Sequence, residues 1–248
     1  MIACAYGMEN TILTHTQTKM SQLEYMLGLK KPAETKILDN TGMNGLIFAT
    51  AASRASDSDI KKATISIPHT GLTLLPALGT GQVEDREEYV RYILSDRLKN
   101  IYDYVFVDLP AGDRGTDFEL TKKLWSLADI NCVVLADAIL WDDYEEKYKD
   151  LLKDPLYILG NYHPESKYNL TAFKLNYSRN AFVIPYCAGY YDAVSSCAVP
   201  TFLLKNEYAA NKVKKSVVRS SFGSKKLNKN DSNAYFMAAV REAKKWFC

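Results

Sequence analysis

Residues 102–115 read Tyr-Asp-Tyr-Val-Phe-Val-Asp-Leu-Pro-Ala-Gly-Asp-Arg-Gly, and this stretch decides the fold class. Its unbroken apolar and aromatic run, residues 104–107, is typical of a strand that is covered on both faces in a parallel sheet. Asp108 follows the run, and Pro110 and Gly112 then predict an immediate turn. Nucleotide-binding α/β folds use such an acid, at the carboxyl end of a buried strand, to face a metal-bound phosphate. The alternative is a strand that ends in Asp because turns favour this residue.

Strand and helix patterns alternate along the chain. We predict strands at 11–16, 72–77, 103–108, 130–136, 156–160 and 181–185. We predict helices at 19–28, 84–99, 116–127, 141–153, 167–176, 188–196, 203–217 and 233–247. This alternation predicts an α/β fold, with a mostly parallel central sheet and helices on both faces. For residues 45–52 a buried strand and a short helix both stay open, because periodicity does not separate them over a brief apolar run.

Five segments resemble motifs of the ParA/MinD-like superfamily of deviant Walker ATPases. Residues 102–112 are similar to the family's Walker B and switch II pattern, in which Tyr-Asp-Tyr and three apolar residues precede Asp-x-Pro-x-Gly. The other four segments stand in the family's order and comprise residues 71–77, 128–135, 156–161 and 183–200. The resemblance extends over about residues 8–204. It implies a P-loop NTPase-like fold.

The phosphate-binding loop of that family is missing. No Lys-Gly-Gly-x-x-Lys-Thr loop occurs anywhere in the sequence, although in the family its backbone N–H groups and lysines hold the phosphates. Residues 11–16 resemble the family's second strand, and His15 and Gln17 stand where the family has acids. A neutral imidazole and an amide lose most of the electrostatic benefit of carboxylates. We therefore expect an N-terminally truncated form of the fold: either the gene product is longer, or the chain is a degenerate relative.

The resemblance assigns binding roles to a small set of residues. It implies Asp108 as the acid on the Mg²⁺ side, Pro110 and Gly112 within the switch loop, and Asn161 and Pro185 as contacts on the adenine side. The implied cofactors are ATP and Mg²⁺. No residue is assigned a catalytic role. We expect impaired hydrolysis, because no lysine-bearing loop neutralises a triphosphate, and the sequence leaves open whether the chain is an enzyme.

Composition indicates a soluble, cytoplasmic protein. Apolar residues make up 47% and charged residues 24% of the 248 residues, which is ordinary for a globular domain. No apolar run is long enough to span a membrane, and no basic start followed by an apolar stretch indicates a signal peptide. The five cysteines are widely spaced and match neither a zinc pattern nor a disulfide framework. We expect a cytoplasmic location, and the sequence leaves open a peripheral association with the inner membrane.

Positive charge is concentrated at the C-terminal end. Residues 205–248 carry 11 lysines and arginines but 3 acids. Such a segment suits nucleic acid, an anionic surface or an acidic partner, and the alternative is a solvated helix face with a linker. We divide the chain into an α/β domain at 1–204 and a basic helical extension at 205–248 that packs on the same domain.

The preferred functional hypothesis follows from the resemblance. The chain looks like an atypical family member of the TadZ/CpaE type, acting in the positioning or assembly of a pilus, secretion or conjugation system. Its expected partners are proteins of that machine and a second copy of itself. One alternative is a genuine ParA-type ATPase that is truncated at its N-terminus. Another is a non-enzymatic, partition-like module that binds DNA through the basic segment.

Overall fold

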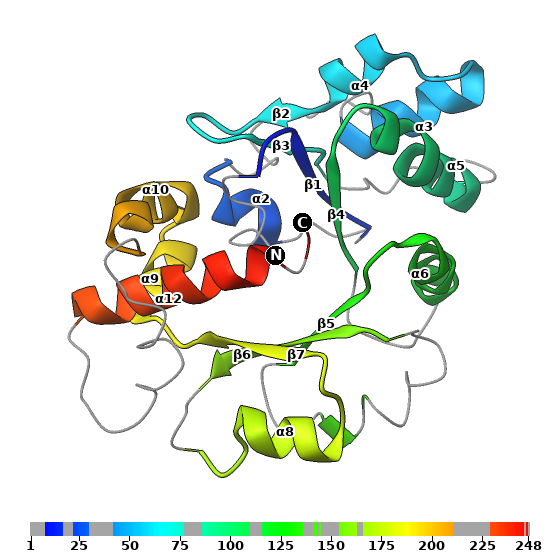
Figure 1. Ribbon diagram of the computed structural model, residues 1–248. Coiled ribbons are helices and arrows are strands. Elements are labelled where there is room, and N and C mark those ends of the chain that lie inside the picture. Colours follow the sequence, from blue (N-terminus) through cyan, green and yellow to red (C-terminus); the bar gives the residue numbers. More distant parts are fainter. Residues whose placement is uncertain are drawn as a thin grey trace. The chain divides into compact units, whose positions relative to one another are not determined.

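A computed structural model describes residues 8–16, 22–29, 42–76, 86–109, 116–135, 141–142, 144, 154–162, 166–210, 229–245 and 247. The chain divides into two compact units, each with its own sheet (Figure 1). The N-terminal unit comprises Met1–Leu127 and Cys197–Pro200, and the C-terminal unit comprises Ala128–Ser196 and Thr201–Cys248. The domain boundary that we expect at residue 204 stays a prediction.

The sheet of the N-terminal unit has the strand order β2-β3-β1-β4. Its strands are β1 (Thr11–His15), β2 (Ile65–Ser66), β3 (Leu72–Leu74) and β4 (Tyr104–Asp108). β1 runs parallel to β3 and to β4, whereas β2 pairs antiparallel with β3. Every residue of β1 is buried, so this strand forms the centre of the sheet. β2 has no counterpart among the predicted strands, because two residues are too few to show an alternation.

The helices of this unit are α2 (Gln22–Met26), α3 (Gly42–Ala52), α4 (Asp57–Ala63), α5 (Arg86–Tyr92), η1 (Ile93–Arg97), η2 (Leu98–Asn100) and α6 (Thr116–Leu127). The open choice at residues 45–52 is resolved as a helix, whose buried Leu46 and Ile47 join the core around Ile12. α3 begins at Gly42 with φ +64°, and a Cβ there would lie 3.1 Å from the Pro76 carbonyl oxygen. Glycine therefore lets α3 start against the end of β3.

The C-terminal unit contains a parallel sheet with the order β5-β6-β7. Its strands are β5 (Cys132–Leu135), β6 (Leu156–Tyr162) and β7 (Ala181–Pro185). The further helices are α8 (Leu170–Asn176), α9 (Ala188–Ser195), α10 (Val199–Ala210) and α12 (Lys229–Lys244). The α/β class with mostly parallel sheets is confirmed. α10 begins earlier than the predicted residue 203, because Pro200 fits the first turn of a helix, where its missing N–H costs nothing.

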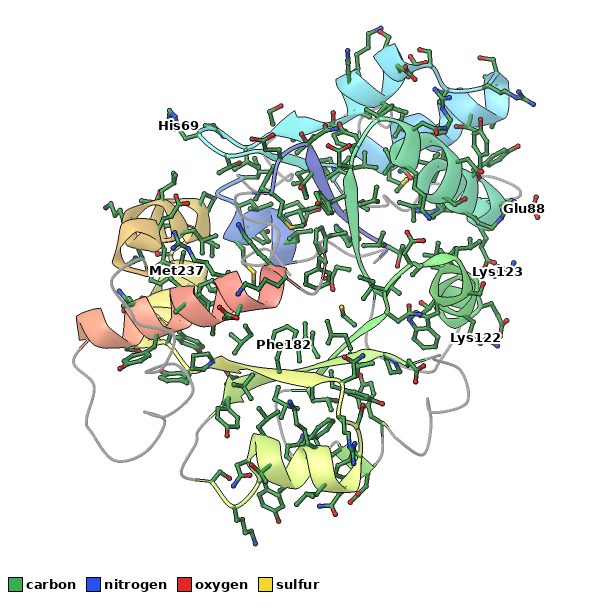
Figure 2. All side chains as sticks on the ribbon, viewed as in Figure 1. His69, Glu88, Lys122, Lys123, Phe182 and Met237 are labelled. Carbon is green, nitrogen blue, oxygen red and sulfur yellow. The ribbon has the colours of Figure 1, made fainter. Side chains whose placement is uncertain are left out.

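Helix α12 is fastened to its own unit by a polar network around Asn233. The Cys187 thiol donates to Asn233 Oδ1 (3.2 Å), and Asn233 Nδ2 donates to Asn206 Oδ1 (3.2 Å). Beside this network the rings of Tyr190 and Phe236 stack with centroids 4.6 Å apart. Apolar packing adds to the network, because Met237, labelled in Figure 2, is 1% exposed. Helix α12, which forms most of the described part of the basic segment, thus packs on β7 and α9.

Gly189→Ala should destabilise the protein by about 1–3 kcal/mol, although alanine is the better helix former. A Cβ at Gly189 would lie 2.5 Å from Asn233 Oδ1, so Asn233 would have to leave its hydrogen bonds. Urea unfolding followed by circular dichroism measures the change in the free energy of unfolding. Gly160→Ala is the matched control, because a Cβ there meets only Val134 Cγ1, at 4.0 Å. An equal cost for both variants would show that Asn233 is not the reason for the glycine.

Candidate functional site

Asp108 lies at the carboxyl end of β4, as the sequence predicts. It pairs in register with His15, the last residue of β1. The Thr16 N–H donates to the Asp108 carbonyl oxygen (3.1 Å), so the β1–β4 ladder continues to this point. Because the two strands are parallel, their carboxyl ends meet at one edge of the sheet, where α/β folds bind ligands.

A buried hydrogen-bonding contact lies close to Asp108 in the same unit. His15 Nε2 lies 2.7 Å from Glu24 Oε1 of α2. His15 is 0% and Glu24 is 4% exposed. The other ring nitrogen, His15 Nδ1, is buried and has no hydrogen-bond partner in the part of the chain that the structure describes. Buried polar atoms are nearly always paired in proteins, so this nitrogen calls for an explanation.

The environment of Asp108 disfavours its charged form. Burial raises the pKa of the Asp108 carboxyl above its ordinary value, and the charge of Glu24 raises it further. Attraction to His15 acts in the opposite direction and lowers the same pKa. A cation at this edge would offset the cost of the charge, which fits the role that the resemblance implies for Asp108.

Two other residues of the predicted site come together in the C-terminal unit. Tyr162 pairs in register with Pro185, so Asn161 at the end of β6 lies next to the end of β7. The register shifts between Leu159 and Tyr162, and Asn161 takes a left-handed backbone with φ 49°. Its side chain is exposed, whereas Pro185 is buried. Asparagine suits this backbone better than most residues, and the shift turns residue 161 out of the strand alternation.

The remaining predicted positions are less informative. Pro110 and Gly112 lie outside the described residues, as does His163. His69 sits at the exposed turn between β2 and β3, with φ 62° (Figure 2). Across the described ranges no group of three or more His, Cys, Asp or Glu side chains could hold a metal ion. None of the helices in those ranges has the length and apolar content that a bilayer crossing requires.

Sequence reasoning did not find Glu24. It lies in the short helix α2, and nothing in its neighbourhood sets it apart from a solvated acid. Its partner His15 draws attention only through the resemblance, as the residue that stands in place of an acid. The contact between them joins a strand to a helix, and no periodicity predicts such a pair.

Asp108→Asn should raise the free energy of unfolding at neutral pH. The folded-state pKa of Asp108 lies above its ordinary value of 3.8, so ionisation of this group weakens the folded state as pH rises through the raised pKa. Below pH 3.8 the carboxyl is protonated in both states, and the difference between variant and wild type should vanish. Urea unfolding at several pH values measures this, with the exposed Asp103→Asn as control. A variant that is less stable than wild type at neutral pH would contradict the assignment.

The comparisons with known proteins identify the fold. The structure is similar to the cell division ATPase MinD of Pyrococcus furiosus, with a TM-score of 0.53 and 15% identity over 97% of this chain and 89% of that one. It is also similar to MinD from Pyrococcus horikoshii in complex with Mg-ADP, with a TM-score of 0.52 and 14% identity over 98% and 86% of the two chains. A third neighbour is a plasmid partition protein from Borrelia burgdorferi bound to AMPPNP, with a TM-score of 0.55 and 13% identity over 100% and 89%.

No protein-family model matches the sequence, and no curated protein matches it. At these identities the likeness concerns the fold alone. The predicted resemblance to the ParA/MinD-like superfamily is therefore confirmed at the level of the fold, which is that of the MinD and plasmid partition structures.

Proposed function

We propose that this chain is a ParA/MinD-like nucleotide-binding protein that acts in the positioning or assembly of a pilus, secretion or conjugation system. Asp108 carries the proposal: a carboxylate at the carboxyl end of a parallel strand, in a fold whose solved examples include complexes with Mg-ADP and AMPPNP. In this proposal Asp108 faces Mg²⁺, Pro110 and Gly112 belong to the loop that follows, and Asn161 and Pro185 contact the base.

In this proposal the chain binds nucleotide, and hydrolysis of the nucleotide is impaired. The sequence contains no glycine-rich loop with lysines, and such a loop supplies most of the attraction for the β- and γ-phosphates. Binding should therefore depend on the base more than on the phosphates. Nucleotide would act as a weak structural ligand that biases contacts with protein partners or with a second copy, in the cytoplasm or at the membrane surface.

The Asn161 side chain tests the proposal most directly. Asn161→Gly removes the amide and keeps a residue that tolerates φ 49°, so the backbone should not change. We expect a loss of about tenfold in affinity for Mg-ATP in calorimetric titration, which is about 1.4 kcal/mol. ATP should also bind no more than about tenfold tighter than adenosine.

Asp154→Gly is the matched control. Asp154 also has a left-handed backbone, with φ 44°, but it precedes β6 at the opposite edge of the same sheet. The Asp154 variant should bind Mg-ATP as the wild type does. The proposal fails if neither ATP nor adenosine binds at millimolar concentration, or if both variants lose affinity equally. ATP binding at micromolar strength would favour an intact phosphate site, and with it the alternative of a genuine ATPase.

The basic segment supports a second candidate function, DNA binding of the partition type. The 11 lysines and arginines against 3 acids in residues 205–248 make a positive segment in a chain whose net charge is only +2. Contacts between lysines and phosphates release counterions, so their affinity falls steeply with salt.

A salt titration separates this candidate from a solvated surface. Binding to duplex DNA, followed by fluorescence anisotropy, should weaken at least about tenfold between low and moderate salt. Replacing Lys212, Lys214 and Lys215 by Gln should reduce the salt slope by about 3. Three surface lysines of the described part, Lys61, Lys122 and Lys123, serve as the control when they are replaced in the same way. Absence of binding at low salt rules the candidate out.

A further inference from the structure

The unpartnered nitrogen of His15 is the strongest unexplained feature of the described residues. The imidazole is 0% exposed, and its Nε2 is held by Glu24 at 2.7 Å. In the neutral tautomer whose proton is on Nε2, this nitrogen donates to Glu24 Oε1 and Nδ1 carries a lone pair. That lone pair is buried and has no partner among the described residues. In metal-ligating histidines a carboxylate commonly holds one ring nitrogen while the other nitrogen, which has no hydrogen-bond partner, binds the metal.

Asp108 supplies a second donor on the same side of the sheet. His15 and Asp108 are paired in register on neighbouring parallel strands, and paired residues project their side chains to the same face. Glu24 adds a further negative charge nearby. Two carboxylates and one imidazole at the ends of β1, α2 and β4 are donor groups that suit a divalent cation.

We propose that His15 Nδ1 and the Asp108 carboxylate are two protein ligands of a divalent transition-metal ion, and that Glu24 orients the imidazole. The inference rests on the proposed function, because phosphate oxygens and water would supply the other ligands. A cage of protein side chains alone is excluded among the described residues, which hold no cluster of three or more such groups. Metal ions of nucleotide sites keep waters and phosphates in their coordination sphere.

The nitrogen ligand predicts which metal binds. Carboxylate, water and phosphate oxygens suit Mg²⁺, whereas imidazole suits ions such as Mn²⁺, Co²⁺ and Zn²⁺. His15 occupies the place where the resemblance expects an acid. The exchange of oxygen for nitrogen should therefore shift the preference of the site from Mg²⁺ toward Mn²⁺.

Manganese provides the probe. The signal of free Mn²⁺ in electron paramagnetic resonance measures binding to the whole chain, with and without ADP, and Mg²⁺ competition gives the selectivity. We expect Mn²⁺ to bind at least tenfold tighter than Mg²⁺. His15→Gln should lower the Mn²⁺ affinity at least tenfold and change the Mg²⁺ affinity less than threefold. Asp108→Asn should weaken both ions. His69→Asn is the control, because asparagine tolerates φ 62° at this exposed turn.

A second measurement leaves His15, Asp108 and Glu24 unchanged in its main variant. The chain has 3 histidines, His15, His69 and His163, so a variant with His69→Asn and His163→Gln keeps only His15. Pulsed paramagnetic resonance of bound Mn²⁺ should then show coupling to a histidine nitrogen. Glu24→Gln should keep this coupling and weaken Mn²⁺ binding, because Glu24 positions the ring without touching the ion.

The outcomes separate this inference from the proposed function. Bound Mn²⁺ without nitrogen coupling, or an unchanged Mn²⁺ affinity in His15→Gln, overturns the inference even if Mg-ATP binds through Asn161. Nitrogen coupling without any nucleotide binding would support His15 as a metal ligand and would contradict the proposed function. Absence of Mn²⁺ binding at millimolar concentration overturns the inference in either case.

Discussion

The register between β1 and β4 is the constraint on which the described N-terminal unit depends. Parallel pairing sets Thr11 opposite Tyr104 and His15 opposite Asp108. The polar side chains of β1 are buried, so each needs a partner: the Thr14 hydroxyl, for example, donates to the Leu75 carbonyl oxygen (3.0 Å). A slip of one residue would move every side chain of β1 to the other face. It would bury these groups without partners and separate His15 from Glu24. The pairing that builds the sheet therefore also positions the candidate site.

Local sequence predicts every described strand except the two-residue β2, because each longer apolar run is bounded by turn residues. Tyr104 to Val107, followed by Asp108 and a proline-containing turn, leaves little choice of structure. Local sequence predicts α3 poorly, because this helix is apolar around most of its circumference and shows no amphipathic period. The sequence predicts the start of α10 too late. Proline usually interrupts a helix, but Pro200 lies in the first turn of α10, where proline is tolerated. Local patterns settle the type of an element more easily than its ends.

The sequence predicts residues of the candidate site only where these residues lie at the carboxyl end of a predicted strand. Asp108, Asn161 and Pro185 all lie at the carboxyl ends of strands, where the fold class itself indicates ligands. Glu24 and the network of Cys187, Asn233 and Asn206 join elements that are far apart in sequence, and no pattern marks such pairs. Asn233 also explains why Gly189 has no side chain, a constraint that is visible only after α12 has packed on α9.

The low identity to the solved structures bears on how function should be read from this fold. At 13–15% identity the chain still takes the arrangement of MinD and ParA-type proteins, because apolar strands and their register suffice to specify it. Donor groups at the strand ends contribute little to that specification, so they are free to change. His15 lies beside Asp108 at the end of β1, and the ligand chemistry of this edge depends on these two side chains more than on the strands that present them. The apolar strands therefore specify the fold, whereas the function of the chain depends on the side chains at the carboxyl ends of these strands.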